Sequence, residues 1–134
     1  MDPEPNRALN PATLAPPTGY SHVVEARGRR TIYISGQVAL DPHGQLVGPN
    51  DLRAQAEQVF QNLQAALAAA GAGFDDVVKL TFYLVDMTQM QAVRDVRGRY
   101  LNPARLPAST AIEVRGLVRP EFLVEIDAIA VRAD

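Results

Sequence analysis

The sequence predicts an α+β fold, in which a mixed β-sheet carries two helices on one face. Segments rich in β-branched and aromatic residues alternate with two amphipathic segments in the order β-β-α-β-α-β-β. Each amphipathic segment has a single apolar stripe, so both helices can cover the same face of the sheet. The chain has 134 residues, 47% of them hydrophobic, which is enough for one domain with a sizeable core.

The first two strands are expected at 20–26 and 31–40, after a proline-rich lead. Residues 1–19 hold five prolines, and we expect them to be extended or disordered because proline fixes φ and lacks a backbone donor. The domain is therefore expected to span 20–134. The sequence Arg-Gly-Arg-Arg at 27–30 is typical of a turn, so the two strands are predicted to pair as a hairpin.

The first helix is expected to begin near residue 51 and to end at Gly71. Asn50 or Asp51 can cap its first turn, and glycine commonly follows a helix. Apolar residues recur at steps of three and four: Leu52, Ala56, Val59, Phe60, Leu63, Leu67 and Ala70. A strand is predicted next, over 77–86.

The second helix is expected to start at a Thr88 cap and to end before Pro103 and Pro107. Its inner stripe is formed by Met90, Val93, either Val96 or Arg97, and Tyr100. Two further strands are predicted at 109–117 and 122–131.

The sheet face turned away from the helices is predicted to be only half apolar. Large apolar residues alternate there with polar ones: Tyr33, Thr81, Tyr83, Val85 and Leu123 with Ser35, Gln37, Glu125 and Asp127. A half-apolar face of this kind usually meets a partner. For a single chain, the economical partner is another copy in a closed symmetric ring.

Composition excludes several classes of function. The formal charge is −2 and no basic cluster occurs, so we expect no nucleic-acid partner. No cysteine is present, so disulfides, thiolate metal sites and cysteine nucleophiles are excluded. The histidines form no pattern of metal ligands, and we predict no metal. No apolar run approaches a membrane span and no signal-peptide core is visible, so a soluble, cytoplasmic protein is expected.

Paired carboxylates on the last predicted strand are the first candidates for chemistry. Glu125 and Asp127 fall on one face of the last strand, where a carboxylate can orient water, although a solvated strand face explains them equally well. Gly36, next to Ser35, lets a ligand or another backbone come close, or serves only packing. Tyr20 can close a site or merely pin the lead to the surface.

Two further candidates lie on and after the second helix. Arg94 sits at the edge of the apolar stripe, where a snorkelling surface arginine is the simpler interpretation. Ser109 and Thr110 open a strand just after a proline, at a position that often borders a pocket. No base accompanies Ser109 in the sequence, so a hydrolase triad is unsupported.

In combination, four segments resemble the RidA/YjgF family. Residues 33–48, 55–71, 75–87 and 124–131 occur in that family's order and spacing, and the resemblance runs from about Tyr20 to Arg132. It implies a chorismate-mutase-like fold assembled as a homotrimer, with the three sheets forming a central barrel. Small-molecule ligands would bind in the clefts between subunits. Members hydrolyse reactive enamines and imines to keto compounds with release of ammonia, and need no cofactor.

Carried over position by position, the resemblance assigns three site residues directly. The lid tyrosine falls on Tyr20, the strand serine on Ser35 beside Gly36, and the water-positioning glutamate on Glu125. Two positions depart from the family. An asparagine on the second helix is replaced by Arg94, and the arginine that anchors the substrate carboxylate is replaced by Ser109, which Thr110 follows.

The departures leave two functions open. Arg105 stands in a Pro-Ala-Arg triplet but is eight residues from Glu113, where the family has four, so we expect it in the loop before the strand. A deaminase-like hydrolase acting on a substrate other than the usual imino acids is one reading. The other reading is a non-catalytic homotrimer that acts as a metabolite-binding or regulatory protein. Ribonuclease activity, sometimes attributed to this family, fits the acidic charge balance least.

Overall fold

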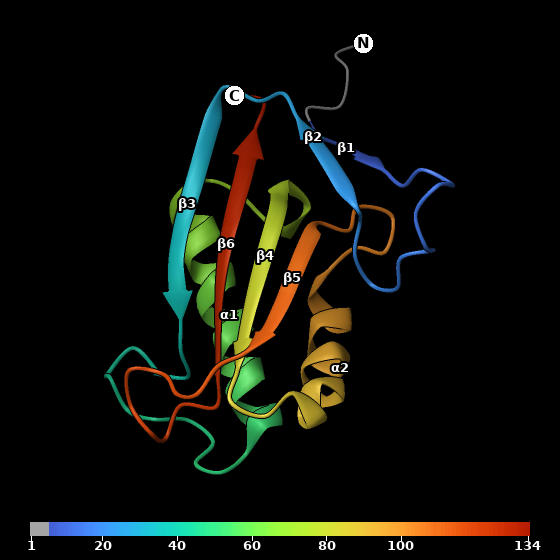
Figure 1. Cartoon of the computed structure of the whole chain (residues 1–134). Coiled ribbons are helices and arrows are strands. Elements are labelled where there is room, and N and C mark those ends of the chain that lie inside the picture. Colours follow the sequence, from blue (N-terminus) through green and yellow to red (C-terminus); the bar gives the residue numbers. More distant parts are fainter. Residues whose placement is uncertain (1–5) are drawn as a thin grey trace.

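Six strands and two helices make up the computed structural model, which describes residues 6–134 (Figure 1). The strands are β1 (Asn6–Leu9), β2 (Val23–Ala26), β3 (Arg30–Gln37), β4 (Val77–Leu84), β5 (Ala108–Glu113) and β6 (Val124–Arg132). The helices are α1 (Leu52–Ala69) and α2 (Met90–Tyr100), each preceded or followed by a short 3-10 turn, at Phe74–Asp76 and Met87–Gln89. The predicted α+β class is confirmed.

The main sheet has four strands in the order β3-β6-β4-β5. β6 runs antiparallel to both of its neighbours, whereas β4 and β5 are parallel, so the sheet is mixed as predicted. β3 and β5 are therefore the two edges. Both helices lie on the same face of this sheet (Figure 1).

The predicted hairpin between 20–26 and 31–40 is wrong. β2 pairs with β1 in a separate two-stranded sheet, with Asn6 opposite Ala26 and Leu9 opposite Val23. Part of the proline-rich lead is thus a strand, while residues 1–5 lie outside the described part. The β1–β2 hairpin sits above the starts of β4 and β5, away from β3 (Figure 1). It is held there because Ser21 donates its backbone N–H to Pro107 O at 2.9 Å.

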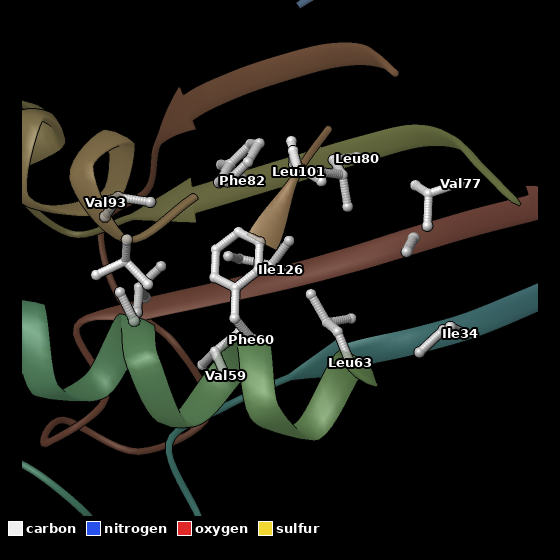
Figure 2. Packing of buried hydrophobic residues seen from close by; sticks show 14 of the residues in the cluster. Ile34, Val59, Phe60, Leu63, Val77, Leu80, Phe82, Val93, Leu101 and Ile126 are labelled. Atoms are coloured by element: carbon white, nitrogen blue, oxygen red, sulfur yellow. The ribbon is translucent and has the colours of Figure 1, made fainter. Parts of the chain in front are cut away.

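The core fills the space between the sheet and the helices (Figure 2). Alternation is regular in β6, where Val124, Ile126 and Ala128 are buried and the residues between them are half-buried. Phe60 of α1 is fully buried and stacks on Tyr100 of α2 with ring centroids 5.2 Å apart. Burying a phenylalanine contributes about 1.5–3 kcal/mol, so this contact helps to fix the two helices against each other.

The ends of α1 follow the sequence signals. Asp51 is the cap, and its carboxylate accepts the N–H of Ala54 at 3.1 Å. Gly71 has φ +70° just past the last turn, where only glycine avoids strain. The predicted Thr88 cap of α2 is wrong, because Thr88 lies inside the 3-10 turn and Asp86 accepts its N–H at 3.0 Å. In residues 6–134 no helix is long and apolar enough to cross a membrane.

The strand ends differ from expectation where loops bond to the core. β4 stops at Leu84 and β6 starts at Val124. The Val85 N–H donates to Leu123 O, and the Leu123 N–H donates to a side chain of α1. Leu123 packs against the core and does not extend the exposed sheet face as predicted. The Leu123 N–H donates to Oε1 of Gln55, whose side-chain amide is fully buried on α1.

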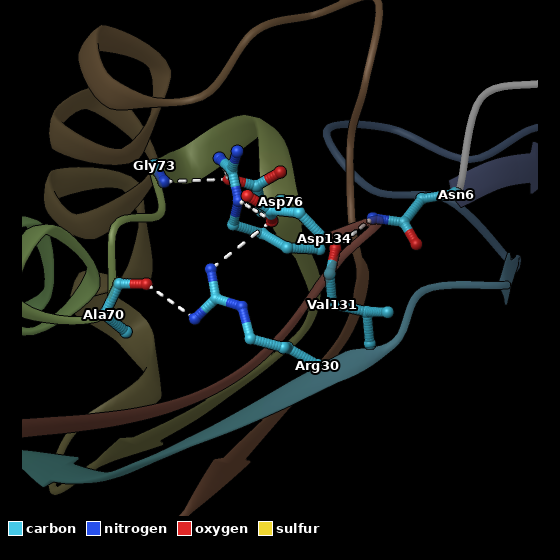
Figure 3. A network of polar contacts seen from close by, with 8 residues as sticks. Asn6, Arg30, Ala70, Gly73, Asp76, Val131 and Asp134 are labelled. Carbon is cyan, nitrogen blue, oxygen red and sulfur yellow. Dashed lines mark hydrogen bonds and ion pairs between the residues drawn. The ribbon is translucent and has the colours of Figure 1, made fainter. Parts of the chain in front are cut away.

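A polar network closes the top of the sheet (Figure 3). Arg30, at the start of β3, donates to Ala70 O at 2.9 Å and reaches Asp134 at 3.4 Å. Arg132 donates to the same carboxylate at 2.8 Å, and these contacts lower the pKa of Asp134 to about 2. Asn6 donates to Val131 O at 2.9 Å, which ties β1 to the end of β6.

Candidate active site

Two carboxylates and a phenol meet on the outer face of the sheet, opposite the helices. Glu125 pairs with Tyr83 across β6 and β4, and Asp127 pairs with Thr81, so all four side chains share this face. The Tyr83 hydroxyl donates to Asp127 Oδ2 at 2.9 Å. The predicted placement of Glu125 and Asp127 on one face, away from the core, is confirmed.

The environment gives these groups different protonation behaviour. The hydrogen bond to Asp127 raises the pKa of Tyr83, with further contributions from burial and from the charges of Asp127 and Glu125. Tyr83 therefore remains a neutral donor throughout the physiological range. Glu125 is half-buried and makes no hydrogen bond or ion pair within residues 6–134. Its carboxylate is available to accept a proton or to hold a water molecule.

Gly36 explains how Glu125 is accommodated. The pairing of β3 with β6 shifts register between Ile34 and Gln37, so Ser35 and Gly36 form an irregularity opposite Asp127. A Cβ on Gly36 would lie 2.2 Å from Glu125 Oε2, far inside van der Waals contact. Glycine thus lets the carboxylate rest against the backbone of β3. The structure brings Gly36 and Glu125 together, with Ser35 next to Gly36 in β3.

The remaining predicted site residues gather at the other edge of the sheet. Tyr20 immediately precedes Ser21, which bridges to Ala108 at the start of β5. The Tyr20 ring packs edge-on against His22 with centroids 5.3 Å apart. Ser109 pairs with Leu80 and so shares the helix-side face, whereas Thr110 pairs with Thr81 on the outer face. Thr110 Oγ1 accepts from Lys79 Nζ at 2.7 Å.

Arg97 is a residue that the sequence interpretation did not assign to the site. Arg94 is exposed on α2, but Arg97, one turn later, is half-buried. A Cβ on Gly19 would lie 2.2 Å from Arg97 Nη2, so the guanidinium lies directly against the backbone that leads into Tyr20. It has no carboxylate partner within residues 6–134, and burial, followed by the charge of Arg94, lowers its pKa. The sequence did indicate that Arg97 faces inward, because Arg97 was one of two candidates for the inner stripe of the second helix.

The predicted site is therefore divided between two edges of one chain. Ser35, Gly36 and Glu125 lie at the β3–β6 side, and Tyr20, Ser109 and Arg97 lie at the β5–α2 side. Arg105 is in the loop before β5, as predicted, where it lines a cavity together with Arg7 and Asp75. Within the described chain, no group of three His, Asp or Glu side chains is placed to hold a metal ion.

Comparison with known proteins identifies the family. The model of the Endoribonuclease L-PSP family matches residues 11–132. A 2-iminobutanoate/2-iminopropanoate deaminase of Mus musculus is 45% identical over 123 residues, covering 91% of this chain and 85% of that protein. The chain belongs to the RidA/YjgF family. RidA from the Antarctic bacterium Psychrobacter sp. PAMC 21119 is 36% identical, with a TM-score of 0.71 over 87% of this chain and 91% of that one.

One solved member of this family extends the similarity to the N-terminal hairpin. The Rid family protein YyfB of Yersinia pestis, of unknown function, is 41% identical and has a TM-score of 0.90 over 96% of this chain and 99% of that one. Residues 6–26 make up about a sixth of the chain, so a superposition that lost them could not reach this score. The hairpin position described above therefore also occurs in that crystal structure.

Proposed function

We propose that this RidA/YjgF protein is a homotrimeric, cofactor-independent hydrolase that converts reactive imine or enamine metabolites to keto compounds and ammonia. The observation that carries the proposal is Glu125, an unpartnered carboxylate held against Gly36 on a polar sheet face. The deaminase names of relatives such as the Mus musculus protein support the reaction class.

The chemistry asks little of the protein. Glu125 accepts a proton from water as the water oxygen bonds to the carbon of the protonated imine, which gives a carbinolamine. The same carboxyl group then gives that proton to the amine nitrogen. The C–N bond breaks as the carbinolamine hydroxyl returns its proton to Glu125, so that ammonia leaves and the carbonyl forms. Tyr83 is a neutral donor beside Glu125, and with Asp127 it keeps this face polar. Catalysis then consists mainly of orienting water and substrate.

The substrate is expected to differ from the small imino acids. Ser109 replaces the arginine that the family resemblance puts at this position, and a hydroxyl makes a weaker, single hydrogen bond to a carboxylate than a guanidinium fork does. Arg97 supplies a positive charge near Tyr20 instead, and the exposed position of Arg94 makes it the weaker candidate for that role. We propose that Arg97 binds the anionic group of a bulkier imine.

The alternative function is ligand binding without turnover. The presence of Ser109 in place of the family arginine favours this alternative, because a ligand that is bound without the arginine to orient it reacts slowly. Binding of a keto acid with no hydrolysis of any imine would support this alternative. RNA is a poor candidate as a ligand, because the net charge of −2 attracts no phosphate backbone.

The test couples an amino-acid dehydratase to keto-acid formation, with semicarbazide competing for the imine. Wild-type protein should accelerate keto-acid release from some imine in a panel of increasing size, and Glu125→Gln should abolish the acceleration. Glu121→Gln, in an exposed loop, is the matched control and should behave as wild type. Ser109→Arg should increase turnover of 2-iminobutanoate. Equal rates for wild type and Glu125→Gln would contradict the proposed role of this carboxylate.

A further inference from the structure

The outer edge of β3 is open. Among the described residues β3 pairs only with β6, so the backbone groups along its other side have no strand partner. The strand is eight residues long, its pairing with β6 is regular from Arg30 to Ile34, and Tyr33 is 77% exposed. A long edge of this kind readily accepts another strand.

β2 also has an open edge, although it lies elsewhere. In the described chain β2 pairs with β1 alone. Val23, on this strand, is a large apolar residue that is 42% exposed. Only three residues separate β2 from β3 in sequence, yet the hairpin is fixed at the opposite edge, where Ser21 Oγ donates to Leu106 O at 2.6 Å.

The hairpin contacts its own chain mainly through polar anchors, with a hollow beneath it. Asn6 donates to Val131 O, and Ser21 bonds to the loop before β5 by backbone and side chain. A cavity of about 240 Å³ lies between the hairpin and the loop before β5, lined among others by Val24 and Leu106. Within the described chain β1 covers one edge of β2, and the other edge of β2 has no strand partner.

We infer that β2 of one copy pairs with the β3 edge of the next copy, so that hairpins are exchanged around a closed ring. The inference rests on the homotrimer of the proposed function. Because the hairpin sits at the β5 edge while the open acceptor is β3 at the other edge, the contact is head-to-tail, and such contacts form a ring where the rotation between copies closes. Each main sheet then gains two strands from its neighbour and has six.

The side chains favour one register for this pairing. Antiparallel alignment of Val23 with Tyr33 brings the two most exposed apolar residues of these strands side by side. The same register sets Val24 opposite Ile32, both half-buried and apolar. A shift by one residue would reverse the face of every side chain and lose both pairs.

Exchange unites the divided site. Continued three residues beyond the start of β2, the same register would set Tyr20 of one copy opposite Gly36 of the next, because the positions in an antiparallel pair advance in opposite directions. Tyr20 would bring Arg97 and the start of β5 with it, since Gly19 lies against the Arg97 guanidinium and Ser21 bridges to Ala108 within a chain. Each site would then combine Tyr20, Arg97 and Ser109 of one copy with Ser35 and Glu125 of its neighbour.

Engineered disulfides test the exchange, and the absence of natural cysteines makes the assay clean. In the double variant Val23→Cys, Tyr33→Cys, paired Cα atoms would be about 4.5–5.5 Å apart, which suits a disulfide. After mild oxidation we expect most of the protein to run as a covalent trimer on non-reducing gels. Val23→Cys with Val118→Cys, an exposed loop position, is the control and should stay uncrosslinked.

The outcomes separate the exchange from the proposed function. A disulfide-closed monomer would show that β2 returns to its own β3, and a trimer by light scattering with no crosslink would show that β3 stays open; either result overturns the exchange. Imine hydrolysis is measured on the wild-type protein and does not depend on these results. If the double variant does not fold, mixing the two single-cysteine variants should give a crosslinked pair, and its absence would equally overturn the exchange.

Discussion

Replacing Gly36 by alanine tests the placement of the catalytic carboxylate with a single methyl group. The new Cβ would lie 2.2 Å from Glu125 Oε2, where ordinary contact begins at 3.4 Å, so the carboxylate must move by more than an ångström. Gly36 is not among the residues with positive φ, and the clash is with the end of a flexible side chain. Alanine should therefore fold normally while displacing the group that holds the water.

The expected loss is large in rate and small in stability. A displacement of about 1 Å in a reacting group commonly costs about 10²-fold in rate, so kcat/KM for imine hydrolysis should fall by that order. The dehydratase-coupled assay measures this, and thermal unfolding checks the fold. Gly116→Ala, in an exposed loop with no atom within 4 Å of the new Cβ, should leave kcat/KM unchanged. A folded Gly36→Ala protein with the wild-type rate would refute the argument that Glu125 works from its place against β3.

Three further predictions concern the core, a buried phenol and the charge near Tyr20. Gln55→Ala should lower the free energy of unfolding by about 3–5 kcal/mol in urea titrations. The reason is that the buried Gln55 amide makes hydrogen bonds to the backbone of Gly48, Glu121 and Leu123. The control Gln64→Ala, at an exposed position of the same helix, should change the free energy of unfolding little. Burial, together with the hydrogen bond to Glu57, raises the pKa of Tyr100 to about 12. The folded state keeps this proton after the unfolded chain loses it near pH ~10, so stability should fall between these values, and less steeply in Tyr100→Phe. Arg97→Gln should raise KM for anionic imines about tenfold while leaving KM for neutral imines unchanged, and equal effects on both would remove its anchoring role.

Periodicity predicted most of the fold correctly. Both helices, the four strands of the main sheet and the face bearing Glu125 follow from apolar spacing, because burial of one face dominates the choice between helix and strand. Asp51 and Gly71 were recognisable as helix ends because each supplies a specific local interaction. These features depend on contacts within a few residues or on one continuous core.

The sequence-based predictions were wrong or incomplete where contacts outside the local apolar pattern determine the structure. The turn at 27–30 suggested pairing of β2 with β3, but bonds from Ser21 to the loop before β5 hold the hairpin elsewhere. Thr88 resembled a helix cap, yet Asp86, two residues earlier, caps the 3-10 turn that precedes α2 and accepts the Thr88 N–H. Arg97 was not assigned to the site from the sequence. Apolar spacing along a helix cannot show that Gly19, 78 positions away, leaves room for the Arg97 guanidinium.

Mixing two impaired variants tests most directly whether each site is shared between copies. Glu125→Gln lacks the water-holding carboxylate, and Arg97→Gln lacks the anion anchor, but a site between one copy of each can contain both wild-type groups. After the variants are dissociated and reassembled in equal amounts, about a quarter of the sites in a symmetric ring should be complete, and activity toward an anionic imine should recover to that extent. Activity no higher than the average of the two separate variants would contradict a site built from two chains.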